Sequence, residues 1–145
     1  MRNASIALLV PLMASVTAPA AEAHVTVEQG TAPAGSTYRA TFRVPHGCEG
    51  HTATTRLTVR LPEGVTGARP MPKAGWVLRI VPRGEPRQAG HGAPPTEAAE
   101  VIWEGGPLED AHYDEFVIRL RLPDEPALLY IPVVQDWLDA EFVNL

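Results

Sequence analysis

Apolar side chains recur at every second position through most of this chain, which is the pattern of β-strands that bury one face. Residues 37–44 read TYRATFRV, with the aromatic and aliphatic residues at the even-numbered positions. The same period of two occurs in later segments, at 56–61, 76–80, 101–103 and 116–122. Residues 129–133 predict a last strand, which Pro132 would confine to a sheet edge or a bulge.

Glycine and proline punctuate these segments, as in Pro62-Glu63-Gly64 and Pro123-Asp124-Glu125-Pro126, where they favour turns. No segment has a convincing helical period. Together these patterns predict an all-β fold, an antiparallel β-sandwich of immunoglobulin-like or cupredoxin-like type with about seven strands.

The N-terminal 23 residues have the organisation of a secretory signal peptide. Arg2 supplies a positive charge, residues 4–16 are almost continuously apolar or small, and Pro19 precedes the cleavage motif Ala21-Glu22-Ala23. The apolar run is shorter than the about 20 residues that span a bilayer. We therefore expect residues 1–23 to be removed after Ala23, the mature chain to have no transmembrane segment, and the protein to be periplasmic or secreted.

Cleavage after Ala23 would make His24 the first residue of the mature chain. Its α-amine and its imidazole Nδ1 could then close one chelate ring on a metal ion, which an internal histidine cannot do because its backbone nitrogen is an amide. Val25-Thr26-Val27 follows at once and would fix His24 to a strand. With one carboxylate added, these donors suit Cu(II) in a tetragonal arrangement. Because the amine has a pKa of about 7.7–8.0 and must lose its proton, affinity should fall as pH drops.

Size and charge limit the other partners. The mature chain of 122 residues has the length of a single domain and can bury a hydrophobic core. Its net charge stays at −5 and it contains no basic run, so nucleic acid is not expected as a partner.

Cys48 is the single cysteine. In an exported protein it could be a buried hydrophobe, a soft metal ligand, or half of a disulfide whose partner is missing.

Short motifs that follow one another along the mature chain resemble the YcnI-like copper-binding domain family. They read HVTV (24–27), AGS (34–36), VPHGCEG (44–50), LPEGV (61–65), MPKAGW (71–76), WEGG (103–106), YDEF (113–116) and LYIPVVQ (129–135). The resemblance implies an exported or membrane-anchored β-sandwich over residues 24–135. It also implies one Cu(II) held by a histidine brace on His24 and by a carboxylate of the YDEF motif. Glu115 matches the family's ligand position better than Asp114.

The C-terminal residues 136–145 depart from the family pattern. The resemblance leads one to expect a second cysteine and a tryptophan-bearing last strand near the copper, and neither is recognisable after Gln135. Because this second cysteine is missing, the sequence offers Cys48 no partner for an intrachain disulfide. Trp137 follows Gln135 too closely to be equated with the family tryptophan, although it remains a weaker candidate for the site. We expect residues 136–145 to be a divergent or truncated tail.

Other polar groups are weaker candidates for metal binding. Asp110 and His112 have the spacing of two ligands on one side of a strand, but a surface pair in the turn before Phe116 is the favoured interpretation. His46, Cys48 and His51 could hold Cu(I) or zinc, but they are better explained as polar residues of a turn.

The leading hypothesis is a non-enzymatic Cu(II)-binding protein outside the cytoplasm that acts in copper storage, delivery or sensing. Its partners would be the copper ion and periplasmic or membrane copper-handling proteins. One alternative is a metal-free β-sandwich for interaction or adhesion. A less favoured alternative is copper-dependent oxidation of the kind that polysaccharide monooxygenases perform. Those enzymes need a second histidine opposite the first, and none is evident in this sequence.

Overall fold

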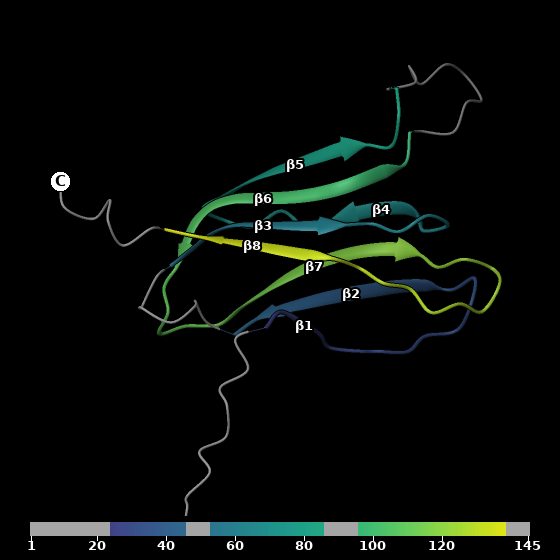
Figure 1. The fold of residues 1–145 in the computed structure, drawn as a ribbon, viewed down its shortest axis with the longest axis horizontal. Helices are drawn as coiled ribbons and strands as arrows, with labels where there is room; N and C mark the ends of the chain where they lie inside the picture. Colours follow the sequence, from purple (N-terminus) through teal and green to yellow (C-terminus); the bar gives the residue numbers. More distant parts are fainter. Residues whose placement is uncertain (1–23, 46–52, 86–95, 139–145) are drawn as a thin grey trace, which may run out of the picture.

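The computed structural model describes residues 24–45, 53–85 and 96–138, which form eight β-strands in two sheets (Figure 1). The strands are β1 (Thr26–Val27), β2 (Thr37–Val44), β3 (Thr54–Arg60), β4 (Thr66–Pro70), β5 (Trp76–Pro82), β6 (Ala98–Leu108), β7 (Asp114–Arg121) and β8 (Val133–Trp137). Within these ranges there is no α-helix. The same residues contain no helix of the length and apolar character that crossing a membrane requires.

The two sheets have the strand orders β1-β2-β7-β4 and β5-β6-β3-β8, and every pairing is antiparallel. The predicted antiparallel β-sandwich is therefore confirmed, with eight strands in place of about seven. The strand that the sequence did not reveal is β4, which reads TGARP and has no apolar alternation. It lies at a sheet edge beside β7 and ends at Pro70, where a missing backbone N–H is tolerated.

The core lies between the sheets and is built from the side chains that the period of two places on the inner faces. Its largest members with almost no solvent exposure are Trp103, Phe42, Phe116, Leu57, Ile118 and Leu120. The Phe116 ring packs edge-on against Trp76 and Trp103, with centroid distances of 5.0 and 5.3 Å. Burial of each such side chain stabilises the fold by about 1.5–3 kcal/mol relative to leaving it exposed.

Two residues on the outer face of the first sheet are also buried. Thr41 is 1% exposed and Val117 is 5% exposed, although the alternation predicts that both face away from the core. They lie opposite each other in the pairing of β2 with β7. Arg39 reaches over this row and donates from Nη1 to Thr41 Oγ1 at 3.2 Å. Long arginine side chains can cover apolar surface with their methylene groups while their charged ends stay in water.

The last strand begins later than the sequence predicts. Leu129 and Ile131 are partly buried against the core but lie outside any strand, and β8 starts at Val133, directly after Pro132. The strand runs two residues beyond Gln135, as far as Trp137, and pairs with β3. Proline therefore precedes β8 and does not interrupt its hydrogen bonds.

Candidate functional site

The candidate ligands among the described residues lie at one end of the sandwich, on the left in Figure 1. In the first sheet, β1 and β7 begin at this end and β2 finishes there. In the second sheet, β3 begins there while β6 and β8 finish, because Thr54 pairs with Leu108 and with Trp137. This arrangement follows from antiparallel pairing, which brings the start of one strand to the end of its neighbour.

His24 lies at this end, two residues ahead of Thr26, and its side chain is exposed. The residues after it are anchored, because Val25 and Val27 are partly buried against the core. Thr26 lies opposite Arg43 in the β1–β2 pairing, and Arg43 lies opposite Glu115 in the β2–β7 pairing. His24 and Glu115 therefore belong to the same end of the same sheet. Their strands are separated by β2 alone, a spacing of about 10 Å between β1 and β7.

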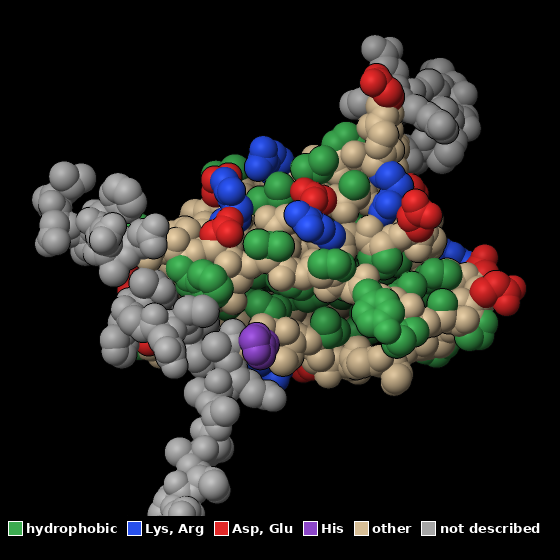
Figure 2. All heavy atoms as spheres, viewed as in Figure 1, with side chains coloured by type: hydrophobic (Ala, Val, Ile, Leu, Met, Phe, Trp, Pro, Cys, Tyr) green, Lys and Arg blue, Asp and Glu red, His purple; other side chains and the backbone are tan. Residues whose placement is uncertain are grey.

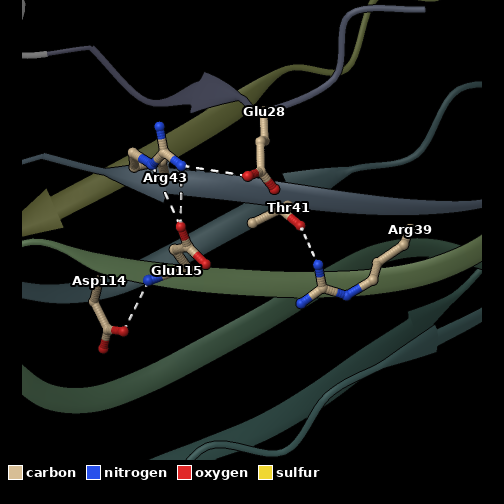
Figure 3. A network of polar contacts seen from close by, with 6 residues as sticks. All are labelled: Glu28, Arg39, Thr41, Arg43, Asp114 and Glu115. Atoms are coloured by element: carbon tan, nitrogen blue, oxygen red, sulfur yellow. Dashed lines mark hydrogen bonds and ion pairs between the residues drawn. The ribbon is translucent and has the colours of Figure 1, made fainter.

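Glu115 lies on the outer face of the first sheet and is paired with Arg43 (Figure 3). Its Oε1 accepts from Arg43 Nη2 at 3.2 Å and from Nε at 3.4 Å. Arg43 Nη2 also lies 3.6 Å from Glu28 Oε1. The three side chains are 36–47% exposed, so water screens both ion pairs.

Asp114 has a different environment from its neighbour Glu115. Its Oδ1 lies 2.6 Å from Lys73 Nζ and accepts a hydrogen bond from the Glu115 backbone N–H at 2.8 Å. Lys73 Nζ also stands 5.0 Å from the centroid of the Phe116 ring. Asp114 is thus held by contacts that tie the start of β7 to the loop between β4 and β5.

The weaker candidates Asp110, His112 and Trp137 lie at the same end of the sandwich. Asp110 and His112 belong to the turn between β6 and β7, in which the His112 N–H donates to Glu109 O at 3.0 Å. The His112 side chain is exposed and Asp110 is half-buried. Trp137 ends β8 and is 38% exposed. The residues His46, Cys48, His51 and His91 lie outside the described parts of the chain.

Within the ranges that the structure describes, no three or more His, Cys, Asp and Glu side chains gather closely enough to hold a metal ion. A histidine brace needs fewer, because one residue supplies both the amine and the imidazole. The donor set of His24 and Glu115 therefore still fits Cu(II) in chemical type. The Arg43 guanidinium beside Glu115 opposes a second cation at that carboxylate.

Sequence reasoning missed three residues of this end: Glu28, Arg43 and Lys73. Arg43 could be recognised as an outward-facing position of its strand, but its two acidic partners are contributed by β7 and by the residue just after β1. Only the strand register reveals them. Lys73 belongs to the MPKAGW motif, which carries no signal that it meets Asp114.

Two other surface regions contain neither His24 nor Glu115. An open cavity of about 150 Å³ lies at the opposite end of the sandwich and is lined by Ala32, Ala34, Leu122, Pro123, Glu125, Pro126, Ala127 and Leu129. The outer face of the second sheet carries the ion pair of Arg60 with Glu100 at 3.1 Å and that of Arg56 with Asp136 at 3.6 Å. Figure 2 shows acidic and basic side chains intermingled on the face in view, so this part of the surface has no field of a single sign.

Residues 24–144 match the family model described as "Domain of unknown function (DUF1775)". Among solved structures, the chain is similar to an uncharacterized protein from Nocardia farcinica whose crystal structure reveals an immunoglobulin-like fold. The two chains are 30% identical with a TM-score of 0.62, over 80% of this chain and 78% of the other. No curated protein matches the chain.

Proposed function

Because the chain belongs to the DUF1775 family, which includes the YcnI-like proteins, we propose that it is a Cu(II)-binding protein acting outside the cytoplasm. The observation that carries this proposal is that His24 and Glu115 lie at the same end of one sheet, although 90 residues separate them in the sequence. A ligand pair at opposite ends of the sandwich would have ruled out a shared metal ion.

Removal of residues 1–23 as a signal peptide would free the His24 amine and expose it at the start of β1. That amine and the His24 imidazole would hold Cu(II) from one side, with the Glu115 carboxylate as the oxygen donor. Deprotonation of the amine sets the pH dependence, so affinity should decrease as pH falls below about 8. The protein would act as a binder in copper handling and not as an enzyme.

The test compares proteins that differ at the N-terminus and at Glu115. Cu(II) is titrated, against a competing chelator, into protein beginning at His24 and into the same chain with one alanine placed before His24. The EPR spectrum is recorded for each. We expect one Cu(II) per chain in the first protein and an affinity at least about tenfold lower in the second. Equal affinities would overturn the brace.

Glu115→Gln should also weaken Cu(II) binding by about tenfold or more, with a change in the EPR parameters that reports loss of an oxygen ligand. The matched control is Glu100→Gln. Glu100 is similarly exposed and is paired with Arg60 at 3.1 Å, but it lies on the outer face of the other sheet. If both variants weaken binding equally, Glu115 is not a ligand. If the wild-type protein binds no stoichiometric copper at neutral pH, the metal-free interaction module becomes the better account.

A further inference from the structure

Arg43 is the cation beside Glu115, one of the two proposed copper ligands. It lies on β2, the strand that separates β1, which follows His24, from β7, which carries Glu115. Thr26, Arg43 and Glu115 form one row across these strands. Because directly paired residues in an antiparallel sheet point to the same face, the Arg43 guanidinium shares the outer face with Glu115.

Arg43 has two acidic partners and not one. Its Nη2 lies 3.2 Å from Glu115 Oε1 and 3.6 Å from Glu28 Oε1 (Figure 3). One guanidinium therefore stands between two carboxylates, and movement away from Glu115 would leave it paired with Glu28. All three side chains are more than a third exposed, so solvent screening keeps the free-energy cost of such a movement small.

A copper ion and a guanidinium compete for the same carboxylate. A divalent ion that binds Glu115 at coordination distance carries two positive charges close to Arg43 Nη2, and the two cations repel each other. The carboxylate can serve the metal fully only when the guanidinium has withdrawn. Glu28 provides the place to which it can withdraw without losing an ionic partner.

We propose that Arg43 is the counter-ion of Glu115 in the metal-free protein and that Cu(II) binding transfers Glu115 from Arg43 to the metal while Arg43 keeps Glu28. This inference rests on the proposed function and adds a competing internal cation that lowers the affinity for copper. Such competition suits a protein that must give up its metal, because the returning guanidinium replaces the departing ion on Glu115.

The test is the Cu(II) affinity of Arg43→Met in protein that begins at His24. Methionine keeps an apolar side chain over the sheet but cannot pair with Glu115. We expect affinity to rise roughly two- to fivefold, which corresponds to the strength of an exposed ion pair. Arg39→Met is the matched control. It removes the same charge from the same strand, but Arg39 donates to Thr41 and makes no contact with Glu115 in Figure 3, so affinity should change little.

The decisive comparison repeats Arg43→Met in the Glu115→Gln background. If Arg43 acts through Glu115, the gain disappears there, whereas a gain of equal size would mean that Arg43 acts only through its long-range charge and would overturn the inference. A loss of affinity on Arg43→Met in the wild-type background would also overturn it, because Arg43 would then be positioning Glu115 for the metal. Thermal unfolding of each metal-free variant confirms that the fold is retained. Failure of the wild-type protein to bind copper would instead reject the proposed function itself.

Discussion

Lys73 Nζ lies 2.6 Å from Asp114 Oδ1, and the same oxygen accepts the backbone N–H of Glu115 at 2.8 Å. Lys73 belongs to the loop between β4, in the first sheet, and β5, in the second. It therefore ties the loop that crosses between the sheets to the first residues of β7. The ammonium group also faces the Phe116 ring at 5.0 Å, so its charge is balanced by a carboxylate and by an aromatic face.

Replacing Lys73 with methionine should lower the free energy of unfolding by about 1 kcal/mol, because the ion pair and the cation–π contact are both lost at a partly exposed position. Urea denaturation of Lys73→Met, Asp114→Asn and the double variant measures the coupling between the two residues. We expect the double variant to lose less than the sum of the single losses. Additive losses would show that the 2.6 Å contact contributes nothing to stability.

Trp103 is predicted to be the most sensitive core position, because it is fully buried and its Nε1–H donates to Met71 O at 3.1 Å. Trp103→Phe removes this hydrogen bond and part of the buried volume, which should cost about 2–4 kcal/mol at equilibrium. Trp137→Phe is the control at a 38% exposed position, where about 0.5 kcal/mol or less is expected. Similar losses in the two variants would contradict the placement of Trp103 at the centre of the core.

Gly106 is a position at which steric space, as well as backbone conformation, requires glycine. Its φ is +81°, and a Cβ atom there would lie 2.6 Å from Trp76 Cζ2 and 2.9 Å from Leu108 N. Gly84 has a nearly identical φ of +80°, and no atom of the described residues lies within 4 Å of its Cβ position.

Gly84→Ala should therefore cost only the strain of the left-handed backbone, about 1–2 kcal/mol. Gly106→Ala should cost more, because the Trp76 ring or the backbone must also shift. Melting temperatures of the two variants test this order, and equal shifts would mean that the Trp76 ring moves aside without cost.

Tyr38 should make the protein less stable in strong alkali. Burial, and secondarily the negative charge of Glu28, raise the pKa of the Tyr38 hydroxyl above its ordinary value of about 10. The neutral hydroxyl also donates to the carbonyl of Gln29. The stabilisation from neutral Tyr38 is complete below the unfolded pKa, near pH 10, and is lost as pH rises through the higher folded pKa.

Unfolding free energies measured from pH 9 to the alkaline limit should therefore fall more steeply in the wild-type protein than in Tyr38→Phe. Tyr113 and Tyr130 are present in both proteins, so the difference between the two curves isolates Tyr38. Parallel curves would show that the raised pKa is not coupled to folding.

The period of two was a reliable guide to the core. It identified the inner positions of β2 and β7, and it placed Trp76 and Trp103 on strand faces, because alternation is a property of each strand by itself. It failed at β4, which is too short and too poor in apolar residues to show a pattern. It also misplaced Thr41 and Val117, since burial on the outer face depends on which long side chains lie above them.

The sequence identified candidate residues of the site but not the contacts that these residues make. His24, Asp114 and Glu115 were recognised through their motifs and their place beside strands. The ion pairs of Arg43 with Glu28 and Glu115 were not recognised, because these residues meet only through the pairing of β2 with its two neighbours.

By itself the sequence determined the class of fold, the faces of most strands and the family, because alternation, turn residues and ordered motifs are local properties of the chain. The tertiary structure decided the order and register of the strands, and with them the position of Arg43 between Glu28 and Glu115. The physical reason is that register depends on hydrogen bonds and packing between segments far apart in the chain. A shift of one residue would turn each of these side chains to the opposite face.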